Sequence, residues 1–286
     1  NQNAVTIPNN TSVGNWLFSV GASAYTFTNA GSFFFTGAGI QINGGSAAIA
    51  NNDVLQFNNS STAGSATITN NANSNLRFIN TSTAGSATIT NNAFLRFLNG
   101  SSAGSATIAN NDFLQFTDTS TAGNAAITNS NNTVQFINAS TAGSATITNN
   151  SFVLFLDTST AGSATIANNN ALQFFNTSTA GSAAIANNVG GNLIFNNAST
   201  AGSATITNSF NVIFSDTSTA GSATITNNSI LQFLNTSMAG SAAITNNSAV
   251  DFFANSTAGS ATIVNNAGGD LNFNAASTAG SATITN

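Results

Sequence analysis

STAGSATITNN, residues 61–71, decides the fold, because close copies of this stretch return along the whole chain. Copies stand at 82–92, 141–150 and 219–228, and looser ones elsewhere. When the chain is aligned on the glycine of each copy, successive glycines lie 19–21 residues apart. A period of this length is typical of solenoids, in which each copy forms one turn of a coil. The thirteen anchor glycines are Gly45, Gly64, Gly85, Gly104, Gly123, Gly143, Gly162, Gly181, Gly202, Gly221, Gly240, Gly259 and Gly280.

The same residue types recur at fixed offsets from the glycine. Ala stands at +2, Ile at +4 and Asn at +6, while Ser stands at −3, Phe at −7 and Leu or Val at −9. Offsets separated by two predict β-strands with one buried face. The inward series, which includes Ala at −1 and Asn or Asp at −5, changes parity across the glycine, so the chain must bend there. The recurring Phe residues are Phe57, Phe78, Phe97, Phe116, Phe136, Phe155, Phe174, Phe195, Phe214, Phe233, Phe252 and Phe273.

Variable offsets between these residues predict the solvent-facing side of the strands. Gln56, Arg77, Arg96, Leu154 and Asp251 all occupy offset −8. Extra residues always fall between the Asn at +6 and the next apolar pair, as in NNVGGNLIF (187–195) against NNSILQF (227–233). A connection that tolerates insertion is expected at a surface corner.

A single copy cannot fold alone. It would bury one Phe, one Leu or Val, one Ile and two Ala, at about 1.5–3 kcal/mol for each large side chain. Ordering its backbone costs about 1–2 kcal/mol for each residue. Stacked copies bury these faces against one another, with strands about 4.8 Å apart. We therefore predict an all-β fold, a parallel β-helix or β-solenoid, with about 19 residues per coil and roughly 13 coils. The preference of parallel crossovers predicts right-handed coiling.

Stacking also explains the inward polar residues. Asn at +6 can donate its amide to one neighbouring copy and accept from the other, as in amide ladders, and Ser at −3 is expected to do the same with its hydroxyl. At −5 the three carboxylates, Asp118, Asp157 and Asp216, never fall on adjacent copies. Like charges about 5 Å apart would repel each other, so this spacing agrees with one copy per coil.

Residues 1–43 lack the period and hold the single Pro, Trp and Tyr. WLFSV (16–20), AYTFT (24–28) and SFFFT (32–36) predict strands. We expect 1–43 to form an N-terminal cap with one or two degenerate coils, and 44–286 to form the solenoid repeats.

Composition opposes most other classes of protein. Only 3% of the residues are charged, with seven Asp against Arg77 and Arg96, and there is no Lys, Glu, His or Cys. Nucleic acid needs clustered cations, and no run of about 18 apolar residues predicts a membrane helix. A signal peptide is either absent or removed. The polar, low-complexity composition raises disorder as an alternative, which the 23 Phe and their regular placement oppose.

The same composition predicts no enzyme. Imidazole bases, thiolate nucleophiles and the usual transition-metal ligands are missing, and the Asp are scattered, with Asp53 and Asp112 at expected turns before strands. We therefore predict no catalytic, cofactor-binding or metal-ligating residues and no cofactor. Arg77 and Arg96 fall on neighbouring coils, which leaves a small anion site and a solvated pair as alternatives.

The units ATITNN…LQF…NTSTAGS resemble the Asn/Ser/Thr/Gly-rich repeats in passenger regions of bacterial autotransporters and related large surface adhesins. Residues 24–52, AYTFTNAGSFFFTGAGIQINGGSAAIANN, resemble the start of such regions. The resemblance implies a parallel right-handed β-helix at the bacterial cell surface, and so an extracellular structural role as an adhesin shaft that meets a host or matrix surface. The chain departs from that family in showing no C-terminal membrane barrel with aromatic girdles, and it stops partway through a repeat.

Two other functions stay open on the sequence. Head-to-tail stacking of an open coil end on a second copy would build an extracellular filament or a functional-amyloid-like fibre. An apolar stripe at offset −6 would serve such assembly if it is exposed, and it consists of Ile79, Leu98, Ile137, Leu156, Phe175, Leu234 and Phe253. Outward Thr-x-Thr pairs resemble the ice-binding faces of β-solenoid antifreeze proteins, with Ala109, Ala167, Ala184, Ala186 and Val264 interrupting them. These pairs are Thr67/Thr69, Thr88/Thr90, Thr146/Thr148, Thr205/Thr207, Thr224/Thr226 and Thr283/Thr285.

Overall fold

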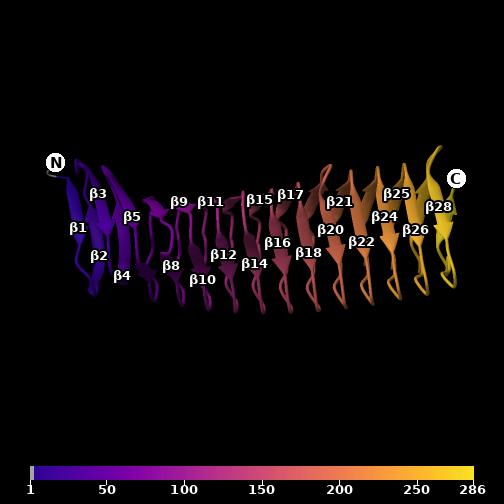
Figure 1. Ribbon diagram of the computed structural model, residues 1–286, viewed down its shortest axis with the longest axis horizontal. Helices are drawn as coiled ribbons and strands as arrows, with labels where there is room; N and C mark the ends of the chain where they lie inside the picture. The colour runs from indigo at the N-terminus through magenta and orange to yellow at the C-terminus, as the bar shows by residue number, and fades with distance from the viewer. Residues whose placement is uncertain (1–2) are drawn as a thin grey trace. The chain divides into compact units, whose positions relative to one another are not determined.

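The structure, a computed structural model, describes residues 3–286. These residues divide into two compact units, an N-terminal unit that ends at Thr146 and a C-terminal unit, Ile147–Asn286. In both units the described chain is made of short β-strands without helices, and each turn contributes one odd-numbered and one even-numbered strand (Figure 1). The predicted all-β parallel β-solenoid is therefore confirmed.

The odd-numbered strands carry the Ile and Asn of offsets +4 and +6. In the N-terminal unit they are β1 (Ala4–Ile7), β3 (Ala24–Asn29), β5 (Ser46–Asn51), β7 (Thr67–Asn70), β9 (Thr88–Asn91), β11 (Thr107–Asn110) and β13 (Ala126–Asn129). β15 (Thr146–Asn149) begins at the boundary, and the C-terminal unit continues with β17 (Thr165–Asn168), β19 (Ala184–Asn187), β21 (Thr205–Asn208), β23 (Thr224–Asn227), β25 (Ala243–Asn246), β27 (Thr262–Asn265) and β29 (Thr283–Thr285). Successive strands pair in parallel and in register, as Ile89 with Ile108.

The even-numbered strands carry the Leu or Val and the Phe of offsets −9 and −7. In the N-terminal unit they are β2 (Thr11–Phe18), β4 (Phe33–Ile42), β6 (Val54–Phe57), β8 (Asn75–Phe78), β10 (Phe94–Phe97), β12 (Phe113–Phe116) and β14 (Thr133–Phe136). In the C-terminal unit they are β16 (Phe152–Phe155), β18 (Ala171–Phe174), β20 (Asn192–Phe195), β22 (Asn211–Phe214), β24 (Ile230–Phe233), β26 (Ala249–Phe252) and β28 (Asp270–Phe273). A third parallel contact per turn, at offset −2, joins residues such as Thr83 and Ser102.

The two units together hold about 15 turns, slightly more than the 13 predicted. Among the described residues, two turns precede the first anchor glycine, because β1 with β2 and β3 with β4 pair into the same two series as the later repeats. The regular glycine spacing does not reach these turns, so counting anchors missed them. Right-handed coiling stays a prediction.

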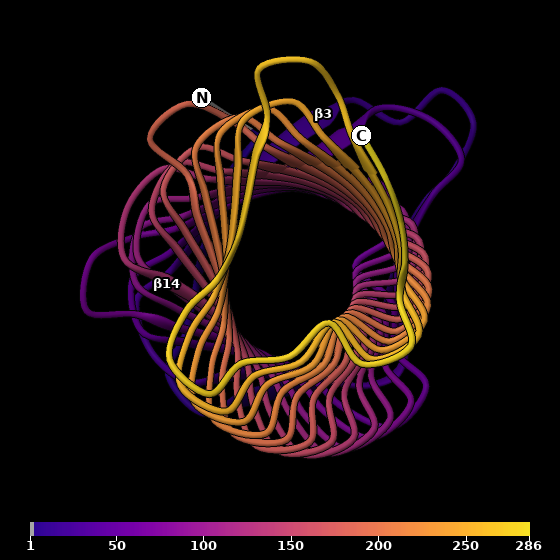
Figure 2. The ribbon, with the colours of Figure 1, turned by 90° about the vertical axis from the view of Figure 1, so that its right-hand side faces the viewer.

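Side chains of successive turns lie over one another, as the sequence predicted. The ring of Phe116 lies between those of Phe97 and Phe136, with centroids 4.7 and 4.8 Å away and rings within 7° of parallel. Equivalent stacks run from Phe155 to Phe273 in the C-terminal unit, whose last turns overlie one another in orange and yellow in Figure 2.

The core of a turn holds the same seven side chains in each interior copy. In one turn Leu114, Phe116, Ser120, Ala122, Ala125, Ile127 and Asn129 are each no more than 2% exposed. Leu114 and Phe116 lie on the even-numbered strand and Ile127 and Asn129 on the odd-numbered strand, while Ser and Ala occupy the segment between them that bends at the glycine. This composition confirms the inward series except at offset −5.

The Asn ladder at offset +6 is confirmed. The amide Nδ2 of Asn91 donates to Oδ1 of Asn110 over 2.8 Å, and Asn110 donates in the same way to Asn129. Each Nδ2 also donates to a backbone carbonyl, as Asn91 does to Phe113 over 3.0 Å, and this second bond fixes which way the amide points. The ladder therefore satisfies a fully buried polar column, which would be costly if it were unpaired.

A second Asn ladder lies one residue further on, at the surface. Asn111 Nδ2 donates to Asn92 Oδ1 over 2.8 Å, and Asn71 donates to Asn52 over 2.6 Å. These donors point toward the preceding turn, whereas those of the buried ladder point toward the following turn. The two amide columns therefore run with opposed dipoles. The sequence predicted the inner ladder and missed the outer one.

The hydroxyl ladder predicted at offset −3 is wrong. The serines are buried, but the hydroxyls of Ser82, Ser101 and Ser120 have no hydrogen-bond partner. Ser178 donates instead to the carbonyl of Phe155, one turn earlier, over 3.2 Å. Equivalent atoms of neighbouring turns lie about 4.8 Å apart, which is too far for an O–H···O bond of about 2.7 Å. Asn spans the gap because its donor and acceptor are separate atoms.

The inward placement predicted for offset −5 is also wrong. Asn80 and Asn99 are exposed and Asp118 is half-buried, and their φ angles are 65°, 60° and 60°. This left-handed conformation is tolerated best by Asn, Asp and Gly. The offset is a corner that breaks the alternation, and Asn or Asp stands there for its backbone rather than for a buried side chain. Ala254 and Ala275 take the same conformation in the last two copies.

The anchor glycine makes the other corner, as predicted. Every anchor has a positive φ, between 60° and 69°. A Cβ on Gly104 would lie 2.5 Å from the carbonyl oxygen of Gly85 on the preceding turn. Both conformation and close backbone approach therefore require glycine. The insertion corner is likewise at the surface, where Val189 is 79% exposed.

Asn110→Ala should destabilise the protein by about 2–4 kcal/mol, because it leaves the Nδ2 of Asn91 and the Oδ1 of Asn129 without their ladder partners. Asn111→Ala, one residue away in the exposed ladder, is the matched control and should cost less than about 1 kcal/mol. Guanidinium unfolding measures both. Equal losses would show that the buried ladder carries no special share of stability.

Gly104→Ala should cost at least about 2 kcal/mol, since alanine resists the left-handed conformation and its Cβ meets the Gly85 carbonyl. Gly100 in the same turn has no positive φ and no atom nearer than 3.5 Å to an added Cβ, so Gly100→Ala should be neutral or stabilising. Thermal unfolding of the two variants compares them. A neutral Gly104→Ala would refute the corner.

Ala254→Asn should stabilise the protein by about 0.5–1 kcal/mol, because Asn tolerates the left-handed region better than Ala does. Ala254→Val should be destabilising, since a β-branched residue is least suited to a positive φ. Chemical denaturation of both variants tests the order. The reverse order would contradict the corner assigned to offset −5.

Candidate functional surfaces

The acidic side chains stand apart from one another. Among residues 3–286, no group of three or more His, Cys, Asp or Glu side chains could hold a metal ion. Asp53 and Asp112 lie in bends directly before β6 and β12, as the sequence predicted. These placements assign the two residues a local role in turns.

The carboxylates at offset −5 belong to the corner column. Asp118 accepts from the backbone N–H of Asn99 over 2.9 Å and from Nδ2 of Asn138 over 3.2 Å. Asp216 bonds in the same way to Asn197 and Asn235, over 3.0 and 3.2 Å. Each carboxylate thus links the corner before it to the corner after it. The expected separation of these Asp by at least one Asn holds in the structure, and the column joins neighbouring turns as the Asn columns do.

The outward Thr residues form in-register rows on the odd-numbered strands. In the N-terminal unit Thr67 lies beside Thr88 and Thr69 beside Thr90. The residue at offset +3 is exposed, as Thr67 and Thr88 are, and the one at +5 is half-exposed. In the C-terminal unit two such rows stand on β21 and β23. The grid predicted from Thr-x-Thr therefore exists over pairs of turns.

Alanines interrupt this Thr grid at the positions that the sequence predicted. Ala184 and Ala186 on β19 leave a shallow depression of about 200 Å³, bordered on either side by Thr165 on β17 and Thr205 on β21. A flat hydroxyl array thus extends over no more than a few turns on either side of this depression.

The outward face of the even-numbered strands is apolar and partly exposed. Offset −10 holds large exposed side chains in several copies, with Phe94 41%, Phe152 46% and Ile230 43% exposed. The stripe at offset −6, which includes Ile79 and Leu156, is half-buried and neither fully exposed nor turned into the core. The three outward columns −10, −8 and −6 of this sheet are called the even-strand face below.

The chain's two cations lie side by side on the even-strand face of the N-terminal unit. Arg96 on β10 is in register with Arg77 on β8. Arg77 Nε donates to Oδ1 of Asn75 over 3.2 Å, and the guanidinium of Arg96 lies 5.2 Å from the ring centroid of Phe94. The Nε of Arg96 is buried without a hydrogen-bond partner. The pair is therefore partly covered by apolar groups rather than freely solvated.

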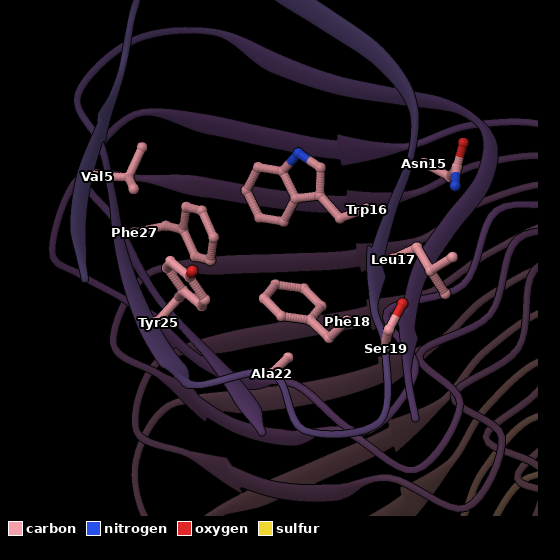
Figure 3. Close-up of a pocket in the computed structure, with 9 residues that line it drawn as sticks. All are labelled: Val5, Asn15, Trp16, Leu17, Phe18, Ser19, Ala22, Tyr25 and Phe27. Carbon is pink, nitrogen blue, oxygen red and sulfur yellow. The ribbon is translucent and has the colours of Figure 1, made fainter. Parts of the chain in front are cut away.

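A pocket of about 530 Å³ lies among β1, β2 and β3, at the first turns of the N-terminal unit (Figure 3). The Trp16 ring stacks on that of Phe27, with centroids 4.1 Å apart, and Phe18 packs edge-on against Phe27 at 6.1 Å. Tyr25 lines the same wall. The pocket is an opening into the aromatic core of these turns, and sequence reasoning missed it because aromatic residues here indicate only buried strands.

No protein-family model, curated protein or solved structure matches the chain. In residues 3–286 no helix is available to span a membrane. The candidate surfaces are therefore interpreted from their own geometry.

Proposed function

We propose that this chain is a non-enzymatic structural protein, the β-solenoid shaft of a bacterial surface adhesin of the autotransporter type. The proposal rests on which residues recur from turn to turn and which vary. The seven buried side chains of a turn return in each interior copy, whereas outward offsets such as −8 change from Gln to Arg, Leu or Asp. A chain whose invariant residues serve stacking or the glycine corner supports a role in shape and length rather than in chemistry.

The stacking of equivalent turns is well suited to building a shaft. Each added turn brings its own backbone pairing, Phe stack and Asn bond, so length can grow by repetition without new residue types. An exposed protein also meets proteases, and a chain with no Lys and only Arg77 and Arg96 offers trypsin-like enzymes two sites. Both lie on paired strands, whose hydrogen bonds to neighbouring turns must open before the backbone can enter a protease active site.

The cell-surface role predicts that antibodies label intact cells of the source bacterium, and that external protease removes the label. Deleting Gly104–Ala122, one complete repeat, should leave surface display and attachment unchanged, because the remaining turns restack in the same register. Circular dichroism of the deleted chain serves as the folding control. Labelling only after permeabilisation would refute the extracellular location, and loss of attachment by a folded deletion variant would refute the shaft role.

Assembly into an extracellular filament is a second candidate. The pocket lined by Trp16, Phe18 and Phe27 supports it, since that aromatic opening could be covered by another copy stacked head to tail. Electron microscopy of the purified chain separates this from the shaft. Ordered filaments that disappear in Trp16→Asp would support the filament, and isolated particles at all concentrations would exclude it.

Ice binding is a third candidate, favoured by the in-register Thr rows on β7 and β9 and on β21 and β23. Ala184→Thr with Ala186→Thr would fill the depression and extend the two Thr rows of β21 and β23 by one turn. If the face binds ice, this double variant should show more thermal hysteresis than the natural chain, and Thr205→Asp should show less. No hysteresis in any of the three proteins would remove the candidate.

A further inference from the structure

Stacked arginines on the even-strand face are unexpected in a chain with almost no charge. Arg77 and Arg96 lie on adjacent parallel strands at the same offset, so their side chains start about 4.8 Å apart. Within residues 3–286 neither has a carboxylate partner. Like charges directly opposite each other destabilise a sheet, and the turns before and after carry Gln56 and Gln115 at this offset. The pair therefore indicates a negative partner that the N-terminal unit does not supply.

The surroundings of the pair favour a protein surface as that partner. The Arg96 guanidinium lies over the ring of Phe94, which is 41% exposed, and Phe113 packs against Phe94 with ring centroids 6.0 Å apart. Ile79 and Leu98 flank the arginines at offset −6. The Nε of Arg96 is itself covered, so a docked carboxylate would accept from the terminal nitrogens of the guanidinium in charge-assisted hydrogen bonds. A free inorganic anion would leave these apolar side chains in water.

The C-terminal unit carries the matching charges on the same face. Asp251 on β26 and Asp270 on β28 are again on adjacent strands, at offsets −8 and −10. Asp270 is exposed, and Asp251 uses one oxygen to accept from Asn272 over 2.9 Å. Apolar neighbours accompany them, with Ile230 43% exposed on β24. The other five of the chain's seven Asp lie at bends or corners.

We propose that the even-strand face of the N-terminal unit docks on the even-strand face of the C-terminal unit of a second copy of this chain. When the strands of the two faces run parallel and their turns are stacked in opposite directions, β10 meets β26 and β8 meets β28. Arg96 then faces Asp251, and Arg77 faces Asp270 one residue pair away along the strand. Sheets pack about 10 Å apart, a gap that a long Arg opposite a short Asp can bridge.

The area of one such contact is that of a small specific interface. Six turns at about 4.8 Å, each about 20 Å wide across the outward residues, cover roughly 600 Å² on one partner. The contact therefore buries about 1,200 Å² in total, at the lower end of the range for specific complexes. This side-by-side pairing does not depend on the proposed shaft role, and it differs from head-to-tail stacking because it uses sheet faces and not coil ends.

Sedimentation velocity of the full chain over a range of concentrations tests the proposal. The chain should dimerise, and raising NaCl from about 0.1 M to about 1 M, which shortens the Debye length from about 10 Å to about 3 Å, should weaken the dimer. Arg77→Asp with Arg96→Asp should raise the dimer Kd at least about a hundredfold, because both charge pairs become repulsive. Asp251→Arg with Asp270→Arg should do the same.

Mixing the two double variants gives the decisive result. Each fails to pair with itself, but together they restore opposite charges between the N-terminal unit of one variant and the C-terminal unit of the other, so a heterodimer should form with a Kd close to that of the natural chain. Thr88→Asp with Thr107→Asp, on the odd-numbered strands of the same turns, is the matched control and should dimerise normally. Circular dichroism confirms that every variant is folded.

Three outcomes would overturn the proposal. The natural chain could be monomeric at every concentration, the charge variants could assemble as well as the natural chain does, or the mixture could fail to restore pairing. Calorimetry with sodium phosphate and sodium sulfate tests the remaining alternative, that the two arginines bind a small anion. Anion binding at the arginines by a chain that stays monomeric would assign them to a small anion and not to a second copy.

Discussion

The repeat distance between parallel strands is the constraint on which the rest of the structure depends. Every buried side chain must accept a copy of itself about 4.8 Å above and below. A Phe ring meets that distance in an offset stack, and ring centroids here are 4.7–4.8 Å apart around Phe116. An Asn amide meets it by presenting a donor to one turn and an acceptor to the other. A Ser hydroxyl cannot bridge that distance to the equivalent hydroxyl of the next turn, so the hydroxyls of Ser82 and Ser101 have no hydrogen-bond partner. Serine occupies this column because the bend requires a small side chain.

Two left-handed corners make it possible for so short a repeat to close a turn. The glycine corner admits no Cβ, because the preceding turn's carbonyl lies where that atom would be. The corner at offset −5 has room for a side chain and uses Asn or Asp, whose polar groups then link neighbouring corners, as Asp118 links Asn99 and Asn138. Strand lengths of four residues follow from the distance between such corners.

Most of the fold could be predicted from the sequence because identical stacked turns make the period, parity and buried set visible in one chain. The inward placement of offset −5 was wrong because alternation alone cannot distinguish an inward position from a positive φ. Asn or Asp in ten copies, with Ala254 and Ala275 in the last two, favours a corner. The turns before Gly45 have no glycine signal. The neighbouring coils of Arg77 and Arg96 were readable as offsets, but the placement of Asp270 beside Asp251, at a different offset, became apparent only with the strand register.

Engineered disulfides test the central claim of register most directly, and the chain offers a clean background because it has no cysteine. Thr88 is in register with Thr107, so the Cα atoms of Thr88→Cys and Thr107→Cys lie within the 4.4–6.8 Å that a disulfide spans. With neighbouring turns in register, this pair should oxidise rapidly and completely within one molecule. Thr88→Cys with Ala109→Cys should oxidise little, because these positions are offset by two residues and lie about 8 Å apart. Equal or preferential oxidation of the second pair would contradict that register.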